Sequence, residues 1–424
     1  MQFSSGMGCR NARHPAILSR MNGFLTSMID LMIVAIAVAL IAHRLRLPYT
    51  VGLVIAGIGL ALSPIHLGVV LTQTIIFEII LPPLLFEAAI NIQWKDLRQD
   101  ALPILTLAIP GTMIAAAVVT LAFHYLLGWP LQPALMFGVL IAATDPVAVI
   151  AMFKDNGVHG RLRLLVESES LLNDGVAAVL FALVLAWVQA SGQSHLETGE
   201  VASLLAVTVG GGILAGAVCA GLAIMLVRRT SDHLVESTVT TVLAYGSFLL
   251  AEHFECSGVL ATVTAGLLMG NLGLAPASKY GGSVTDKGRE FTLALWDFLA
   301  FIANSFVFLL IGITVAGIPF HELGNRALSF DIVMVLISRA LTIYPLCVLF
   351  RRSRWRISAK FQHVLWWGGL RGALGLALAL SLPATLEMRN QVLIATFGVV
   401  VFSVVVQGLT MPLLLRAMGI TQSR

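Results

Sequence analysis

The sequence predicts an all-α polytopic membrane protein with about thirteen transmembrane helices. Hydrophobic residues make up 58% of the 424, only 11% are charged, and the mean hydropathy is +0.91. Soluble domains carry about 25% charged residues, so a soluble fold of this length could not cover its surface with so few charges. Lipid is therefore the expected solvent.

Apolar windows of roughly 20 residues, the length that crosses a bilayer as a helix, occur thirteen times. They cover residues 24–43, 48–64, 68–90, 103–127, 132–152, 164–190, 203–227, 234–252, 256–273, 291–316, 330–350, 362–383 and 391–415. No stretch between them could form a separate soluble domain. We expect one transmembrane domain over 24–417, an N-terminal extension over 1–23 and a short cytoplasmic tail over 418–424.

The basic residues predict the orientation. Nineteen Lys and Arg fall in the odd-numbered connections and the C-terminal tail: Arg44, Arg46, Lys95, Arg98, Lys154, Arg161, Arg163, Arg228, Arg229, Lys279, Lys287, Arg289, Arg351, Arg352, Arg354, Arg356, Lys360, Arg416 and Arg424. The opposite side holds five: Arg10, Arg13, Arg20, Arg326 and Arg389. The positive-inside rule then places the N-terminus outside and the C-terminus in the cytoplasm of a cell (inner) membrane.

The three arginines of the N-terminal tail stand on the wrong side of this arrangement. Met21 would make a natural start just before the first span. We therefore expect residues 1–20 to come from an over-extended start site, with an uncleaved or processed extension as the alternative. Mass spectrometry of the native N-terminus tests this, and a mature chain that begins at Met1 would contradict it.

Several other classes of protein are not indicated. The net charge of +4 is spread over the loops without a dense patch, so nucleic acid is not expected as a partner. The four cysteines share no CxxC spacing and the ten histidines form no HExxH, so neither metal nor disulfide chemistry is predicted. No cofactor is expected.

Two basic residues, Arg339 and Arg371, fall inside predicted spans. The acidic residues there are Asp30, Glu78, Glu87, Asp145, Glu167, Glu169, Asp174 and Asp297. Each ionised group near a helix centre costs roughly 2.5–3.5 kcal/mol, so these groups are expected to pair or to face an interior cavity. Acids outnumber bases, and such a cavity would attract cations and exchange protons.

The densest polar cluster lies at the start of the sixth span. On an ideal helix Glu167, Ser170 and Asp174 share one stripe, which Asn173 flanks, and Glu169 lies one turn from Asn173. Carboxylate, hydroxyl and amide oxygens are the hard ligands that small cations prefer. The alternative is an exposed first turn that leaves only Asp174 buried.

The fifth span carries Thr144, Asp145 and Pro146 in its middle. Proline at mid-helix removes a hydrogen bond and clashes with the preceding turn, which frees carbonyls near Thr144. Freed carbonyls and a carboxylate would complete a cation site. The alternative is a simple kink that Asp145 caps.

The twelfth span crowds four glycines and Arg371 into residues 368–375. Glycine permits either unwinding or close helix packing, whereas the arginine needs a partner inside the membrane. Broken helices in corresponding positions of two halves are typical of inverted-repeat transporters. The fifth and twelfth spans are therefore the predicted pair of discontinuous helices.

These segments resemble the monovalent cation:proton antiporters of the Na⁺/H⁺ exchanger family, in its prokaryotic electroneutral branch. The matching segments are Leu-Pro-Pro-Leu-Leu-Phe-Glu at 81–87, Ala-Thr-Asp-Pro-Val-Ala-Val at 143–149, Glu-Ser-Leu-Leu-Asn-Asp-Gly at 169–175, Phe-Leu-Ala-Phe-Ile-Ala-Asn-Ser at 298–305 and Gly-Gly-Leu-Arg-Gly at 368–372. The resemblance covers residues 24–415. It implies an inverted-repeat antiporter fold with two crossed discontinuous helices, in a homodimer within the lipid membrane.

The resemblance also implies the roles of individual residues. Asp174 would bind the cation or proton, and Asn173 would complete the Asn–Asp pair. The further site groups would be Thr144, Asp145 (directly or through water), Glu169 and Ser170, with Asp174, Glu169, Ser170 and Thr144 as ligands of the transported Na⁺. Arg371 would balance the charge of the core beside Glu169, and Arg339 resembles a second family arginine. Glu167, which shares Asp174's stripe, and Glu87 are held in reserve.

The Asn–Asp pair bears on stoichiometry, because it leaves one principal carboxylate and the family branch with Asn exchanges one ion for one. Ligand types alone do not separate Na⁺ from K⁺ or Li⁺, so a K⁺/H⁺ antiporter is the alternative. A channel would need a filter loop, and no TVGYG-like segment is present. An intramembrane aspartyl enzyme using Asp145 and Asp174 is a remote alternative, since no GxGD occurs.

Overall fold

The structure is a computed structural model that describes residues 14–45, 47–63, 71–190, 198–230, 232–274 and 286–420. Most of the predicted start-site segment, with Arg10 and Arg13, lies outside these residues, as do Lys279 and Arg424. Within them the chain forms α- and π-helices and no strand. The prediction of an all-α fold is confirmed.

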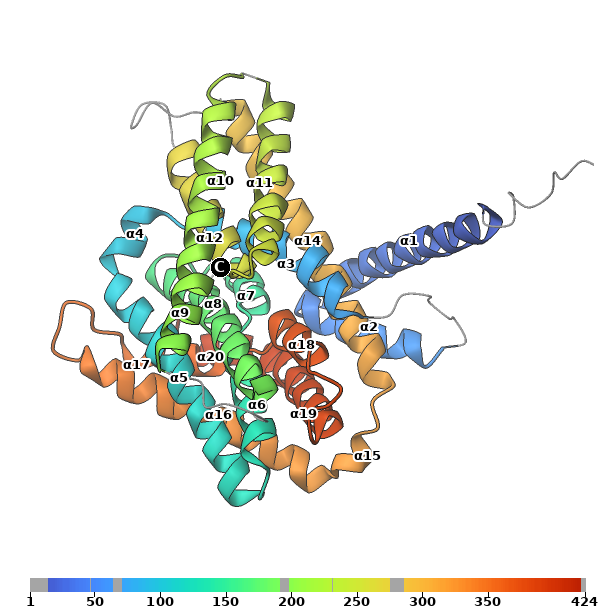
Figure 1. Cartoon of the computed structure of the whole chain (residues 1–424), viewed down its shortest axis with the longest axis vertical. Helices are drawn as coiled ribbons and strands as arrows, with labels where there is room; N and C mark the ends of the chain where they lie inside the picture. Colours follow the sequence, from blue (N-terminus) through green and yellow to red (C-terminus); the bar gives the residue numbers. More distant parts are fainter. Residues whose placement is uncertain are drawn as a thin grey trace, which may run out of the picture.

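Figure 1 shows the described helices, coloured in chain order. They are α1 (His14–Leu45), α2 (Tyr49–Ala61), η1 (Ile75–Ile80), α3 (Leu81–Asn91), α4 (Trp94–Gln99), α5 (Ala101–Leu126), α6 (Leu131–Ala142), α7 (Val147–Asp155), α8 (Arg161–Ala190), α9 (Thr198–Leu205), η2 (Ala206–Gly211), α10 (Gly212–Val227), α11 (His233–His253), α12 (Gly258–Leu268), η3 (Met269–Gly273), α14 (Asp286–Ala316), α15 (Phe320–Leu323), α16 (Asn325–Leu349), α17 (Ala359–Trp367), α18 (Ala373–Leu380), α19 (Arg389–Phe402), η4 (Ser403–Gln407) and α20 (Gly408–Ala417).

Some helix bounds follow the predicted spans closely, whereas α1 begins at His14, ten residues before its window. The window 103–127 corresponds to α5 and the window 234–252 to α11, each within two residues. Among the described residues, nine helices are long and apolar enough to cross a membrane, and Tyr49–Ala61 and Gly258–Gly273 are shorter apolar helices. The chain is thus a multi-pass membrane protein, and the count of thirteen spans stays a prediction.

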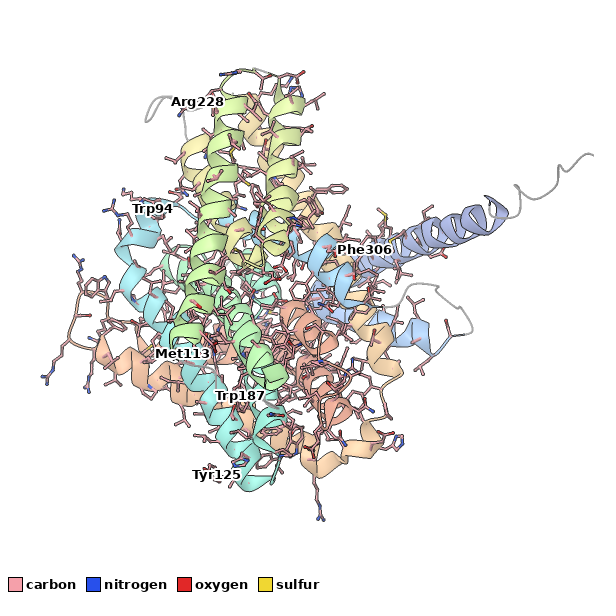
Figure 2. All side chains as sticks on the ribbon, in the orientation of Figure 1. Trp94, Met113, Tyr125, Trp187, Arg228 and Phe306 are labelled. Carbon is pink, nitrogen blue, oxygen red and sulfur yellow. The ribbon has the colours of Figure 1, made fainter. Side chains whose placement is uncertain are left out.

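Several helices that are neighbours or far apart in the sequence pack directly on one another. Helix α2 packs along α14, α5 lies against both α6 and α16, and α10, α11 and α12 pack on one another. Figure 2 shows Arg228 at the end of α10 and Tyr125 near the end of α5, at opposite ends of the molecule. Helix α1 extends away from this body (Figure 1).

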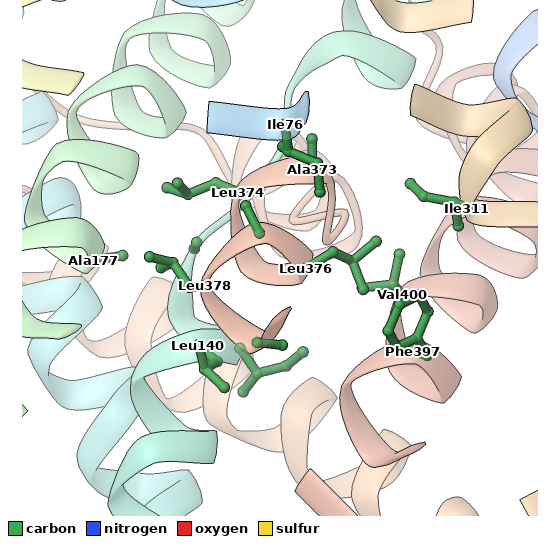
Figure 3. Close-up of a cluster of buried hydrophobic side chains, with 14 of the residues drawn as sticks. Ile76, Leu140, Ala177, Ile311, Ala373, Leu374, Leu376, Leu378, Phe397 and Val400 are labelled. Carbon is green, nitrogen blue, oxygen red and sulfur yellow. The ribbon is translucent and has the colours of Figure 1, made fainter. Parts of the chain in front are cut away.

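The apolar core encloses the short helix α18. Figure 3 shows its side chains in the middle of a cluster to which η1, α6, α8, α14 and α19 contribute. The residues of this cluster include Ile76, Leu140, Ala177, Ile311, Ala373, Leu374, Leu376, Leu378, Phe397 and Val400. Because α18 is covered on all sides, the unwound chain that leads into it lies inside the protein.

Candidate functional site

Two discontinuous helical segments cross at the centre of the protein. The first is interrupted at residues 143–146, between α6 and α7, and the second at residues 368–372, between α17 and α18. The backbone N–H of Asp145 in the first break donates to the carbonyl of Leu370 in the second, at 2.7 Å. The prediction of two crossed discontinuous helices is confirmed.

Local chemistry explains the first break. Pro146 has no N–H to give, and the residue before a proline is disfavoured in the helical conformation. The carboxylate of Asp145 then accepts from the N–H of Val147 at 2.9 Å, which caps the first turn of α7. Asp145 therefore acts as a cap, as the alternative of a simple kink predicted. The helix is not merely kinked, however, because it is interrupted for four residues between α6 and α7.

Glycine is required where the two breaks touch. A Cβ on Gly372 would overlap the carboxylate of Asp145. The neighbouring Arg371 is 2% exposed, and its guanidinium donates to the carbonyls of Ala142 and Ala143 at 2.9 and 3.0 Å. These carbonyls end α6, where the helix dipole is negative. The arginine thus occupies the C-terminal end of α6.

Helix α8 reaches the first break through Ser170. Its hydroxyl donates to the carbonyl of Thr144, and the hydroxyl of Thr144 donates to that of Ser170 at 3.2 Å. One turn later on α8, Asp174 is partly exposed to a cavity of about 50 Å³. Thr144, Asp145 and Gly372 line the same cavity. The structure therefore brings Asp174 to the place where both breaks meet.

The other walls of the cavity are apolar. They come from Leu81, Leu84, Leu85 and Ala88 of α3, from Leu171 of α8, and from Ala373, Leu374 and Gly375 of α18. A carboxylate facing such walls has few competing protein partners. Asp174 forms no ion pair with a nitrogen within 4.0 Å among the described residues.

Asn173 precedes Asp174 on α8, but it is not among the residues that line the cavity. It is 1% exposed, and neither its amide oxygen nor its amide nitrogen has a hydrogen-bond partner among the described residues. A buried polar group is normally hydrogen-bonded to protein, water or an ion. The amide therefore keeps its capacity to bind a water or an ion, and the role of Asn173 in an Asn–Asp pair stays a prediction.

The buried carboxylate of Glu169 pairs with Arg339, which corrects one prediction. Arg339 on α16 donates to both oxygens of Glu169, at 2.9 and 2.8 Å, and also to the carbonyl of Leu365 at 3.2 Å. Arg371, which we expected beside Glu169, shares neither a hydrogen bond nor an ion pair with that carboxylate in the described part of the chain, because its guanidinium donates to the carbonyls that end α6 instead. The role of Glu169 as a cation ligand stays a prediction.

The two reserve residues lie apart from the cavity lining. Glu167 accepts from Arg163 at 3.3 Å, one turn earlier on α8, and Glu87 on α3 accepts from Asn91 at 2.8 Å. Helix α8 runs from Arg161 without interruption, and residues 167–170 are buried. The alternative of an exposed first turn at these residues is therefore wrong.

Two residues that support the site were missed at the sequence level. Ser403 accepts from the backbone N–H of Arg371 at 3.0 Å, and Gln407 donates to the carbonyl of Trp367 at 2.9 Å. Both belong to the last apolar window, and they are 1% and 3% exposed. Their polar character in an otherwise apolar window was the available signal.

Comparisons with known proteins agree with this architecture. The profile of the family described as sodium/hydrogen exchanger, transmembrane, matches residues 31–417. The Na⁺/H⁺ antiporter ApNhaP of Aphanothece halophytica is 41% identical over 382 residues, which are 89% of this chain and 71% of the relative. The Na⁺/H⁺ antiporter NhaH of Halobacillus dabanensis is 34% identical over 417 residues, 94% of this chain and 100% of the relative.

A solved structure has the same fold. The sodium proton antiporter MjNhaP1 of Methanocaldococcus jannaschii superposes with a TM-score of 0.72 at 19% identity. The match covers 94% of this chain and 100% of that structure.

Proposed function

Because the chain belongs to the sodium/hydrogen exchanger family, we propose that it exchanges Na⁺ for protons across the cell membrane. Members of this family are transporters rather than enzymes. The observation that carries the proposal is the exposure of Asp174 to a cavity where two discontinuous helices meet. The names of the relatives, which are Na⁺/H⁺ antiporters, support Na⁺ as the cation.

The proposed mechanism is competition for one site. Asp174 binds either a proton or a Na⁺ ion, and the hydroxyl and carbonyl of Thr144 and the carboxylate of Asp145 provide further oxygens near the ion. Hard oxygen ligands of this kind suit a small alkali cation. Since both ligands need the same carboxylate, one leaves before the other binds, and this coupling makes the protein an exchanger rather than a leak.

The charges of the buried core support one-for-one exchange. Around the two breaks lie three carboxylates (Asp145, Glu169 and Asp174) and two guanidinium groups (Arg339 and Arg371). With all five groups ionised, the core carries one negative charge, which one Na⁺ or one proton neutralises. Moving the empty, charged core through the membrane would cost roughly 2.5–3.5 kcal/mol for its uncompensated charge. The neutral, occupied core is therefore the form that crosses.

The proposal includes an orientation and an assembly. The positive-inside count places the C-terminus in the cytoplasm. Arg228 and Tyr125 lie at opposite ends of the molecule (Figure 2), in agreement with a cytoplasmic end that carries Arg228 and an outer end near Tyr125. Apolar side chains of α1, such as Ile29, Ile33 and Leu40, are 57%, 59% and 69% exposed. This face suits lipid or a second copy of the chain, in line with the homodimer that we expect.

A proteoliposome assay tests the function. A Na⁺ pulse given to vesicles that contain the protein and a pH-sensitive dye should move protons, and Asp174→Asn should abolish this flux. Asp232→Asn is the matched control, because Asp232 is 56% exposed at the N-terminus of α11 and asparagine is an equally good cap. Substantial Na⁺-dependent flux in Asp174→Asn would contradict the role of this carboxylate.

The same vesicles test the identity of the ion. Equal pulses of Na⁺, Li⁺ and K⁺ compare the three cations, and we expect Na⁺ to give the larger response. A response to K⁺ alone would replace the Na⁺ proposal with K⁺/H⁺ exchange.

A further inference from the structure

The last long helical segment contains a π-helical turn opposite the second break. Residues 403–407 form η4 between α19 and α20. A π-turn inserts one extra residue into an α-helix and changes the direction of the side chains around it, and such turns are frequent at functional sites. Ser403 opens this turn and Gln407 closes it, and both side chains are nearly fully buried.

These two side chains replace one specific hydrogen bond. In a continuous helix the N–H of Arg371 would donate to the carbonyl of Trp367, four residues earlier. The break separates these two groups and leaves each without its helical partner. Ser403 Oγ instead accepts from the N–H of Arg371 at 3.0 Å, and Gln407 Nε2 donates to the carbonyl of Trp367 at 2.9 Å.

The hydroxyl of Ser403 is itself anchored. It donates to the carbonyl of Val400 on its own helix at 2.8 Å, and the carbonyl of Arg371 is a second, longer acceptor at 3.4 Å, so the oxygen stays next to the break. Buried backbone groups that lose their partner cannot turn to water. The pair therefore stabilises the unwound conformation against closure into a regular helix.

We propose that Ser403 and Gln407 are positioning residues for the ion site. By holding residues 368–371 unwound, they place the carbonyl of Leu370 against the N–H of Asp145 and the guanidinium of Arg371 against the end of α6. Both contacts fix the first break, where Thr144 and Asp145 line the cavity. This inference rests on the proposed function, because the geometry that it controls is that of the cation site.

The transport test compares two buried hydroxyls on the same segment. Ser403→Ala should raise the KM for Na⁺ on the order of tenfold, since the N–H of Arg371 loses its acceptor, and should change the ratio of Li⁺ to Na⁺ affinity. Thr396→Val is the matched control, because Thr396 is fully buried and donates only to Val392 of its own helix at 2.7 Å. It should leave the KM for both cations unchanged.

Hydrogen exchange of the purified protein gives a readout that does not depend on transport. Amides at 369–371 should exchange on the order of tenfold faster in Ser403→Ala than in the wild type or Thr396→Val. Gln407→Met tests the other half of the pair and replaces Ser403→Ala should that variant not fold. A wild type that moves no Na⁺ would overturn the proposed function only. Exchange rates and KM values in both variants equal to those of Thr396→Val would overturn the positioning role.

Discussion

The ion pair between Glu169 and Arg339 allows a quantitative prediction. The two side chains are 2% and 5% exposed, and they share two hydrogen bonds of 2.9 and 2.8 Å between α8 and α16. Removing one partner of such a pair leaves a buried charge without compensation, which costs about 3–5 kcal/mol. We therefore expect Glu169→Gln alone, and Arg339→Met alone, to lower the stability of the protein by about this amount.

The double variant distinguishes a charge effect from a loss of packing. Glu169→Gln combined with Arg339→Met removes both charges, and replacing a buried ion pair by neutral side chains is often close to neutral for stability. The double variant should therefore be more stable than either single variant. The two positions are in direct contact, so their effects are not expected to add.

An exposed pair on the same protein serves as the control. Lys154 and Asp297 approach to 3.9 Å with side chains 58% and 57% exposed. Water and salt screen such a pair, which contributes about 0–1 kcal/mol, so Lys154→Met should change stability little. Thermal unfolding of the five proteins in detergent, followed by tryptophan fluorescence, measures all these differences. A double variant as unstable as the sum of the single ones, or single variants as stable as Lys154→Met, would refute the reasoning.

Two further predictions concern the site itself. Lowering the pH should raise the apparent KM for Na⁺, by up to about tenfold per pH unit for a single competing proton, because the proposed mechanism has protons and Na⁺ compete for the carboxylate of Asp174. A KM that stays constant from acid to alkaline pH in a flux assay would argue against competition. Gly372→Ala should abolish exchange, since its Cβ would overlap Asp145, whereas Gly246→Ala, with no atom within 4 Å of the added Cβ, should leave flux unchanged. Equal flux in the two glycine variants would contradict the close contact of the breaks.

The sequence was sufficient to predict the helices and the positions of both breaks. In lipid no water is present to bond the backbone, so its N–H and C=O groups pair within a helix. Long apolar windows therefore predict helix bounds, as they do for α5 and α11. Proline without an N–H and a run of glycines similarly mark where the helices at 143–146 and 368–372 end. Each of these signals lies within the segment whose structure it predicts, so no contact with a distant segment is needed to place the helix ends and the breaks.

The partners of the buried charges could not be predicted in the same way. Arg339 and Arg371 are both single basic residues in apolar windows, and only the packing of α16 against its neighbours decides which of them reaches Glu169. The π-turn at 403–407 could not be predicted either: Ser403 and Gln407 stand out as polar residues, but Ser-Val-Val-Val-Gln is equally compatible with a regular α-helix. Both features depend on contacts between segments that are far apart in the chain.

The observed pairing leaves Asp174 without an arginine partner among the described residues, which the proposed binding of an ion there requires. An arginine bound directly to Asp174 would occupy the carboxylate and compete with Na⁺. Arg339 instead neutralises Glu169, and Arg371 is held by the carbonyl dipoles that end α6, where it contributes positive charge to the core without covering a carboxylate. These carbonyl groups stabilise the guanidinium of Arg371 through their dipoles and add no negative charge of their own. The charge of the core is thereby limited, while Asp174 at the cavity has no arginine partner among the described residues, as the proposed competition between Na⁺ and a proton requires.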